Sequence, residues 1–182
     1  QAMTDCRLCK LCTTRQRIVK STESRDAVLA FVGEAPGYEE DRLGVPFVGA
    51  AGQLLDRMLS AMNLSRSEVL ISNVVRCRPP QNRQPERDEI EACLPFLWQT
   101  LESASKLRFI VTLGNTPLRV LSGDSHAKIS QWRGSWFERT IGERTFRVMP
   151  TFHPAYLLRN PGEKMKVWAD LQAVMGVLQN AG

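Results

Sequence analysis

Short apolar segments alternate with amphipathic segments along most of this chain. Runs rich in Val, Ile, Leu and Phe predict buried strands at residues 27–34, 69–76 and 108–114. Between them, apolar residues recur every three or four positions, which predicts helices over residues 49–63 and from Pro85 onward. Strands that alternate with helices indicate an α/β fold, in which a mainly parallel sheet has helices on both faces.

The pattern changes in the last third of the chain. Residues 134–152 alternate between apolar and polar and contain Gly142, which predicts two strands joined by a turn. A last helix is expected over roughly residues 163–179. A length of 182 residues is typical of one domain, so we expect residues 1–182 to form a single domain. Residues 1–3 are interpreted as a remnant of an expression vector.

The composition adds a mild positive charge. The chain has 24 Lys and Arg against 19 Asp and Glu, a net charge of +5, which favours an anionic partner such as nucleic acid. No apolar run approaches the roughly 20 residues of a membrane span, and the start lacks the pattern of a signal peptide. We therefore expect a cytoplasmic protein whose thiols stay reduced.

Loops of unusual composition follow the predicted strands. The loop over residues 33–52 is rich in glycine, which lets backbone N–H groups approach a ligand, and it matches neither the Walker nor the GxGxxG pattern. Phe47 in this loop suits stacking on a flat ligand, and His153 follows a predicted strand with Pro154 directly behind it. Ligands bind beyond the carboxyl ends of parallel strands, so we expect these loops to gather at one edge of the sheet.

Cysteines form a second candidate site. Cys6 and Cys9 have the spacing C-x2-C, Cys77 follows a predicted strand, and Cys93 lies in a predicted helix. Ligation by sulfur alone indicates zinc or an iron–sulfur cluster, and either would tie the N-terminus to the middle of the fold. Buried or disulfide-bonded cysteines are the simpler alternative. Cys12 offers a third candidate ligand within the first segment.

Together with the cysteines, three motifs resemble the iron–sulfur uracil-DNA glycosylases of family 4. They are GEAPGYEEDRLGVPFVGAAGQLL, SNVVRCRPPQNRQP and HPAYLLRNP, in this order. The resemblance extends from the first cysteines to the last helix. It implies a three-layer α/β/α sandwich around a mainly parallel four-stranded sheet. It also implies one structural four-iron four-sulfur cluster, held by Cys6, Cys9, Cys77 and Cys93. Cys12 is then not a ligand of the cluster.

The activity that this resemblance implies is DNA repair. Such an enzyme flips uracil out of DNA and hydrolyses its N-glycosidic bond, leaving an abasic site without lyase activity. Phe47 is then the ring that stacks on uracil, and Asn73 reads its N3–H and O4, a pattern that cytosine reverses. The backbone of the glycine-rich loop completes the uracil pocket, at Gly33, Ala35 and Gly37.

Catalytic roles follow from the same resemblance. His153 donates to uracil O2 and stabilises the departing anion. Ala35 stands where better-known glycosylase families carry an Asp or Asn that positions the water, so we expect Glu34 or Glu40 to orient it. Glu40 also lies near uracil C5, where the methyl group of thymine must be refused, and Asn82 is expected to orient this carboxylate.

The expected partner is uracil-containing DNA, single- or double-stranded, bound by a monomer that associates with the nucleoid rather than a membrane. Leu157 is expected to act as a wedge that fills the gap left in the base stack by the flipped base. The helix that begins at GAAG offers backbone N–H groups to a phosphate. The expected DNA contacts are Gly49, Gly52, Pro154, Leu157, Arg159 and Arg83. Two alternatives are a protein of this fold that binds uracil-DNA covalently or without turnover, and a non-catalytic binding module.

Overall fold

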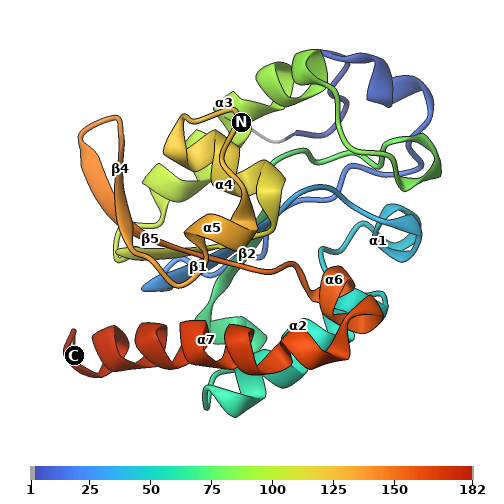
Figure 1. Cartoon of the computed structure of the whole chain (residues 1–182). Coiled ribbons are helices and arrows are strands. Elements are labelled where there is room, and N and C mark those ends of the chain that lie inside the picture. The colour runs from blue at the N-terminus through green and yellow to red at the C-terminus, as the bar shows by residue number, and fades with distance from the viewer. Residues whose placement is uncertain (1–2, 182) are drawn as a thin grey trace.

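A five-stranded sheet forms the middle layer of the computed structural model, which describes residues 3–181 (Figure 1). The strand order is β2-β1-β3-β5-β4, and only the β4–β5 pair is antiparallel. This confirms a mainly parallel sheet, but the expected count of four strands is wrong, because a hairpin turning at Gly142 adds β4 as an edge strand. The bounds are β1 Leu29–Gly33, β2 Leu70–Asn73, β3 Phe109–Leu113, β4 Phe137–Ile141 and β5 Arg144–Thr151.

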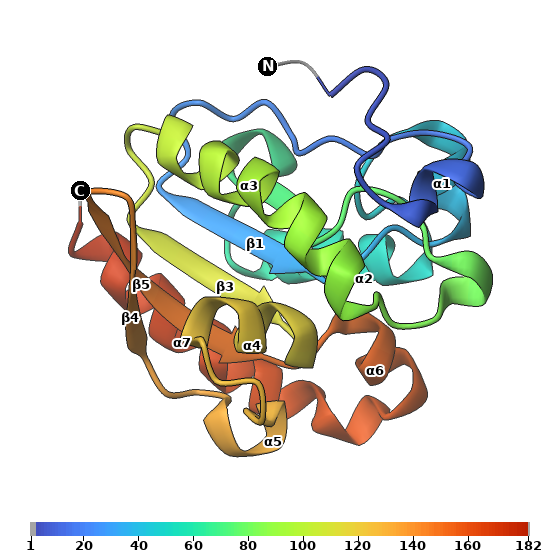
Figure 2. The same cartoon turned by 90° about the horizontal axis from the view of Figure 1, so that it is seen from above.

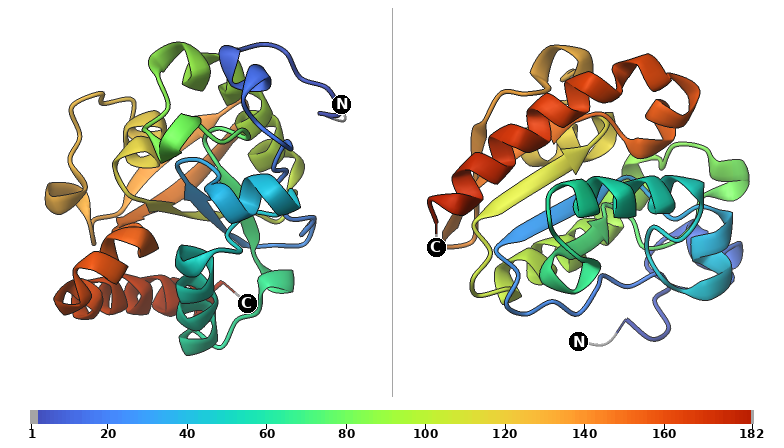
Figure 3. Two further views of the ribbon diagram at one scale, coloured as in Figure 1. Left: turned by 90° about the vertical axis from the view of Figure 1, so that its right-hand side faces the viewer. Right: turned by 90° about the horizontal axis from the view of Figure 1, so that it is seen from below.

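Helices cover both faces of the sheet. Figure 2 shows α3 and α4 over one face, and the right-hand view of Figure 3 shows α2 and α7 over the other. The bounds of these four helices are α2 Ala50–Ala61, α3 Arg87–Ser103, α4 Asn115–Ser122 and α7 Lys164–Gln179. The remaining helices are short: η1 Lys10–Thr13, α1 Tyr38–Leu43, η2 Arg66–Glu68, η3 Pro80–Asn82, α5 Ile129–Trp132, α6 Pro154–Arg159 and η4 Pro161–Glu163.

The apolar pattern of the strands explains these layers. Every residue of β1 is buried, because successive side chains point to opposite faces that are both covered. Phe31 packs in the core on one face, whereas Ala30 and Val32 pack in the core on the other. The predicted three-layer α/β/α arrangement is therefore confirmed (Figure 1).

The register of the sheet brings the strand ends together. Gly33 at the end of β1 pairs with Asn73 at the end of β2, and Leu113 at the end of β3 pairs with Thr151 at the end of β5. The loops after four parallel strands consequently begin at the same edge. The N-terminal segment crosses toward this side of the molecule, where the Val19 N–H donates to the carbonyl of Arg76 at 2.8 Å (Figure 3).

Two further expectations from the sequence concern the first residues and membrane-spanning segments. Residues 1 and 2, part of the segment interpreted as a vector remnant, lie outside the described residues. Within residues 3–181, no helix has the length and apolar character needed to cross a membrane.

Candidate active site

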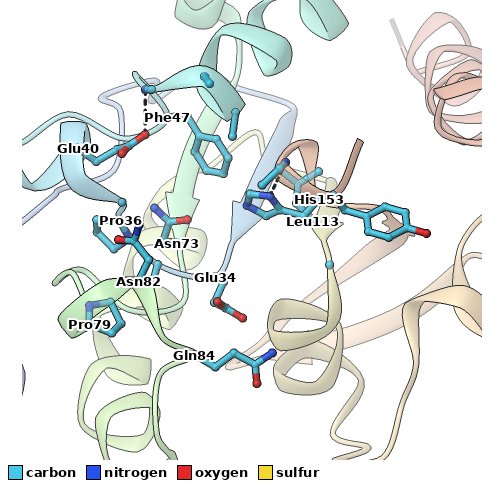
Figure 4. Close-up of a pocket in the computed structure, with 18 of the residues that line it drawn as sticks. Glu34, Pro36, Glu40, Phe47, Asn73, Pro79, Asn82, Gln84, Leu113 and His153 are labelled. Atoms are coloured by element: carbon cyan, nitrogen blue, oxygen red, sulfur yellow. Dashed lines mark hydrogen bonds between the residues drawn. The ribbon is translucent and has the colours of Figure 1, made fainter. Parts of the chain in front are cut away.

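A cleft of about 800 Å³ opens at the carboxyl edge of the sheet (Figure 4). Its walls come from the loops after β1, β2, β3 and β5, the segments that were expected to gather there. Most of the candidate site residues line it, namely Glu34, Ala35, Gly37, Glu40, Phe47, Gly49, Asn73, Asn82, Arg83, His153 and Arg159. The cleft therefore combines an aromatic wall with several polar groups that converge from separate elements.

Asn73 presents an unsatisfied amide to this cleft. It ends β2, is only 3% exposed, and its Oδ1 accepts no hydrogen bond within residues 3–181. A buried acceptor without a partner costs about 1–3 kcal/mol, so a ligand that donates to Oδ1 would recover that free energy. Gly33 makes room for the amide, since a Cβ there would lie 2.5 Å from Asn73 Oδ1 and 2.5 Å from Phe47 Cζ.

Phe47 forms the aromatic wall, and its backbone is strained. Its φ is 53°, a left-handed conformation that costs a non-glycine residue about 1–2 kcal/mol. The Phe47 carbonyl accepts from the Arg66 guanidinium, and Gly52 packs so closely that a Cβ there would lie 1.9 Å from the same oxygen. The ring is 5% exposed and stacks against the His153 imidazole, with 5.7 Å between centroids (Figure 4).

His153 is held as a neutral imidazole with a defined tautomer. It is the N-cap of α6, where Nδ1 accepts from the Ala155 N–H at 3.0 Å, so the proton of the neutral ring is assigned to Nε2. Burial, followed by the charge of Arg159, lowers the pKa of His153 from 6.5 to about 4, and only the charge of Glu40 opposes this. The site thus contains a neutral N–H donor at ordinary pH.

Two carboxylates differ in how they are held. Glu40 Oε1 accepts from the N–H groups of Val48 at 3.0 Å and Gly49 at 3.1 Å, which fixes this side chain to the loop (Figure 4). Glu34 Oε2 accepts from the Thr116 hydroxyl at 2.5 Å. Thr116 was not predicted as a site residue, although its position at the start of the helix that directly follows β3 is a recognisable signal.

The expected contact between Asn82 and Glu40 is absent from the described residues. Its Oδ1 accepts from Arg78 Nε at 2.8 Å, and no hydrogen bond joins Asn82 to Glu40 in the described part of the chain. The reason is local, because the short helix η3 ends at Asn82 with a left-handed φ of 56° and leaves this side chain exposed. The Val48 and Gly49 amides orient Glu40 instead.

Leu157 is also wrong as the wedge. It is 1% exposed and packs in the core, because the period of α6 turns it toward α2. Its neighbour Leu158 is 44% exposed. Pro154, the first residue of α6, is buried, whereas Arg159 in the last turn is exposed and forms no ion pair with any described residue.

Other expected DNA contacts are already engaged within the protein. The Gly49 N–H donates to Glu40, and Gly52 is buried against Phe47, so neither is free to hold a phosphate. Arg83 lines the cleft, but its Nη1 and Nη2 donate to the buried Glu89 at 2.9 and 2.6 Å. A phosphate contact by Arg83 stays a prediction that rests on its remaining N–H groups.

The candidate metal ligands approach one another from three segments. Cys9 precedes η1, Cys77 follows β2, and Cys93 lies on α3. Burial, with smaller contributions from Cys77 and Cys9, raises the pKa of Cys93 to about 11 although Arg76 acts to lower it, and Cys77 likewise interacts with Cys9 and Cys6. No three described His, Cys, Asp or Glu side chains are grouped closely enough for a metal ion.

The sequence profile of the uracil DNA glycosylase superfamily matches residues 20–172, and the chain belongs to this superfamily. Several relatives carry the name Type-4 uracil-DNA glycosylase. The protein of Sulfurisphaera tokodaii is 40% identical over 173 residues, 93% of this chain and 78% of its own length. That of Saccharolobus solfataricus is 40% identical over 179 residues, 96% of this chain and 82% of its own. That of Thermotoga maritima is 38% identical over 179 residues, with 97% and 91% covered. The predicted membership of family 4 is confirmed.

Proposed function

We propose that this protein is a DNA repair glycosylase that flips uracil out of DNA and hydrolyses its N-glycosidic bond, leaving an abasic site. The observation that carries this function is the Asn73 amide, buried beside an aromatic wall with an acceptor that nothing in the described chain satisfies. Uracil N3–H donates to Oδ1 and uracil O4 accepts from Nδ2. Cytosine presents an acceptor at N3 and a donor at C4, so the same amide rejects it.

Stacking and backbone donors complete the recognition of uracil. The flipped base lies against the face of Phe47, whose rigid backbone keeps the ring in place. The backbone of Gly33, Ala35 and Gly37 borders the base. Glu40 approaches C5 and refuses the methyl group of thymine, because the Val48 and Gly49 amides prevent this side chain from moving aside.

Electrostatic stabilisation of the leaving group supplies most of the rate. Bond cleavage places negative charge on uracil O2, and His153 donates to it through Nε2–H without first losing a proton. One well-aimed donor of this type contributes on the order of 3 kcal/mol to the transition state, a hundredfold or more in rate. No lyase activity is expected, since the reaction is a hydrolysis.

Glu34 orients the attacking water. The Thr116 hydroxyl donates to Oε2 of this carboxylate, and Glu34 lines the cleft (Figure 4). Glu40 is less suited, since its Oε1 already accepts two backbone hydrogen bonds. We expect Glu34→Gln to slow single-turnover excision more than Glu40→Gln does. If both variants keep the full rate, neither carboxylate orients the water.

DNA approaches across the mouth of the cleft. The N–H groups of Ala50 and Ala51, in the first turn of α2, lie at the cleft and suit a phosphate. Arg159 is a second phosphate contact, and Leu158 replaces the buried Leu157 as the side chain that enters the vacated base stack. The protein acts on single- or double-stranded uracil-DNA as a monomer, inside the cell and at the nucleoid.

A structural four-iron four-sulfur cluster is held by Cys6, Cys9, Cys77 and Cys93. The donor set is all sulfur, which iron–sulfur clusters use. Cysteines from three separate segments of the chain interact electrostatically with one another, which fits a shared site with sulfur ligands. When bound, the cluster ties the N-terminal segment to β2 and α3.

Release of free uracil from a labelled oligonucleotide tests the function. A glycosylase releases many equivalents per protein, a covalent binder forms one adduct per protein, and a binding module releases nothing. Asn73→Ala is expected to lower single-turnover excision by a hundredfold or more, since the variant loses both base-reading hydrogen bonds. A variant with the wild-type rate would overturn the assignment of Asn73. Exposed Gln53→Ala, in α2, is the matched control.

A further inference from the structure

Arg76 is a buried cation without a matching anion. It lies between Val75 and Cys77 and is 3% exposed. Its Nη1 donates to the hydroxyl of Ser21 at 2.5 Å and its Nη2 to the hydroxyl of Thr100 at 3.0 Å. Its Nε has no partner, and no carboxylate pairs with this guanidinium anywhere in residues 3–181.

The buried carboxylates of this fold are all compensated: Glu40 and Asp41 accept hydrogen bonds from backbone N–H groups, and two others are paired with arginines. Glu89, fully buried, binds Arg83 through both of its oxygens, and the buried Asp170 binds Arg133 in the same way. A buried charge that lacks such a partner costs several kcal/mol, and an arginine does not escape this cost by losing its proton. The two neutral hydroxyls accept from Nη1 and Nη2 of Arg76 but leave its Nε without a partner and its charge uncompensated.

The missing negative charge lies on the side of the cysteines. The backbone N–H of Arg76 is directed at the sulfur of Cys93, and the guanidinium interacts electrostatically with Cys93. Arg76 also directly precedes Cys77 in the chain. From the other side, Arg15 Nη1 donates to the sulfur of Cys77 at 3.5 Å. Two cations thus flank the cysteine pair, one buried and one half-buried.

We propose that Arg76 is the internal counter-charge of the iron–sulfur cluster, with Arg15 as a second cation on its solvent side. The proposal rests on the cluster of the proposed function. A four-iron four-sulfur core held by four thiolates is negatively charged, so cluster and guanidinium compensate each other in the same low-dielectric region. Arg76 is a positioning residue here: it stabilises the bound cluster electrostatically and favours its reduced, more negative state.

Matched variants separate the charge of Arg76 from its hydrogen bonds. Arg76→Met removes the charge at similar volume, Arg76→Lys retains a charge, and Ser21→Ala removes one hydrogen bond but leaves the guanidinium. Iron and sulfide content, the rate of cluster loss to a chelator and the midpoint potential are measured on each purified protein. We expect Arg76→Met to lose its cluster about tenfold faster or more and to have a lower midpoint potential. Arg76→Lys and Ser21→Ala should remain close to the wild type.

A second variant keeps the test decisive if Arg76→Met does not fold. Arg15 is half-buried, so Arg15→Met leaves the core intact and is expected to shift the midpoint potential in the same direction by a smaller amount. Exposed Arg57, on the opposite layer in α2, gives the control Arg57→Met, which should change neither the potential nor cluster loss.

Several outcomes would overturn the proposal. The proposal is wrong if folded Arg76→Met has the midpoint potential and the rate of cluster loss of the wild type. It is also wrong if Ser21→Ala changes both quantities as much as Arg76→Met does, because Arg76 would then act only through its hydrogen bonds. If Arg76→Met does not fold, an unchanged potential in Arg15→Met counts in the same way. A wild-type protein without iron and sulfide also overturns it, but uracil release by that protein would leave the glycosylase function intact.

Discussion

The neutral state of His153 predicts how the reaction responds to acid. Its pKa of about 4 leaves the ring roughly 90% neutral at pH 5, whereas a histidine with the ordinary value of 6.5 would be about 3% neutral there. If the neutral ring is the donor to uracil O2, the contribution of His153 to the rate falls by only about a tenth between pH 7.5 and 5. An unperturbed histidine would give a fall of about thirtyfold.

The assay compares the wild type with His153→Gln in single-turnover excision from a uracil-containing oligonucleotide across this pH range. The variant is expected to be about a hundredfold slower at every pH, because it lacks the aimed donor. The ratio of the two rates isolates His153, since other titrating groups affect both proteins alike. A ratio that falls tenfold or more between pH 7.5 and 5 would refute the neutral donor.

The same pKa predicts a stability change with a definite sign. Below pH 6.5 the unfolded chain takes up a proton at His153 that the folded protein refuses until about pH 4. The contribution is therefore fully present above pH 6.5 and is lost as the pH falls toward 4, by at most about 3 kcal/mol for a ring that is only half-buried. Urea unfolding of the wild type and His153→Gln should show their stability difference changing in that range. A constant difference would contradict the lowered pKa.

Three further substitutions test the geometry of the site. Leu158→Ala should impair excision from duplex DNA more than from single strands and leave the free energy of unfolding unchanged. Leu157→Ala should instead destabilise the protein by about 2–5 kcal/mol. The reverse pattern would show that Leu157 is the wedge. Gly52→Ala should destabilise by about 1–3 kcal/mol and slow excision, since its Cβ meets the Phe47 carbonyl, while Gly176→Ala, with nothing within 4 Å, should be neutral or slightly stabilising in thermal unfolding. Thr116→Val should lower the single-turnover rate about tenfold and Thr116→Ser restore it; equal rates would remove the hydroxyl from the orientation of Glu34.

Periodicity predicted the layers of this fold because buried strands and amphipathic helices leave strong local signals. The predicted strand at 69–76 nevertheless ends at Asn73, although the N–H groups of Val74 and Val75 still donate to the end of β1 and the loop that follows it. The antiparallel β4 was visible as part of a hairpin, but its place at the sheet edge depends on the pairing of β5 with β3, which no local pattern specifies.

The sequence predicted which residues line the site better than it predicted which partners they contact. Phe47, Asn73 and His153 share the cleft because strand ends in a parallel sheet share an edge. The partner of Asn82 and the burial of Leu157 depend on backbone dihedrals and on the packing of one helix against another. Two adjacent leucines cannot be told apart by composition, and only their positions around the helix axis separate them.

The left-handed backbone of Phe47 has a consequence for the timing of base capture. Arg66 and the close approach of Gly52 hold this conformation in the free protein, so its cost is met once, when the chain folds. An extruded base then meets a surface that is already shaped, and capture does not need to order a flexible loop on each encounter. Gly52 belongs to the first turn of α2. A DNA strand whose phosphate binds at that turn is therefore held at a fixed position relative to the Phe47 ring that receives its base.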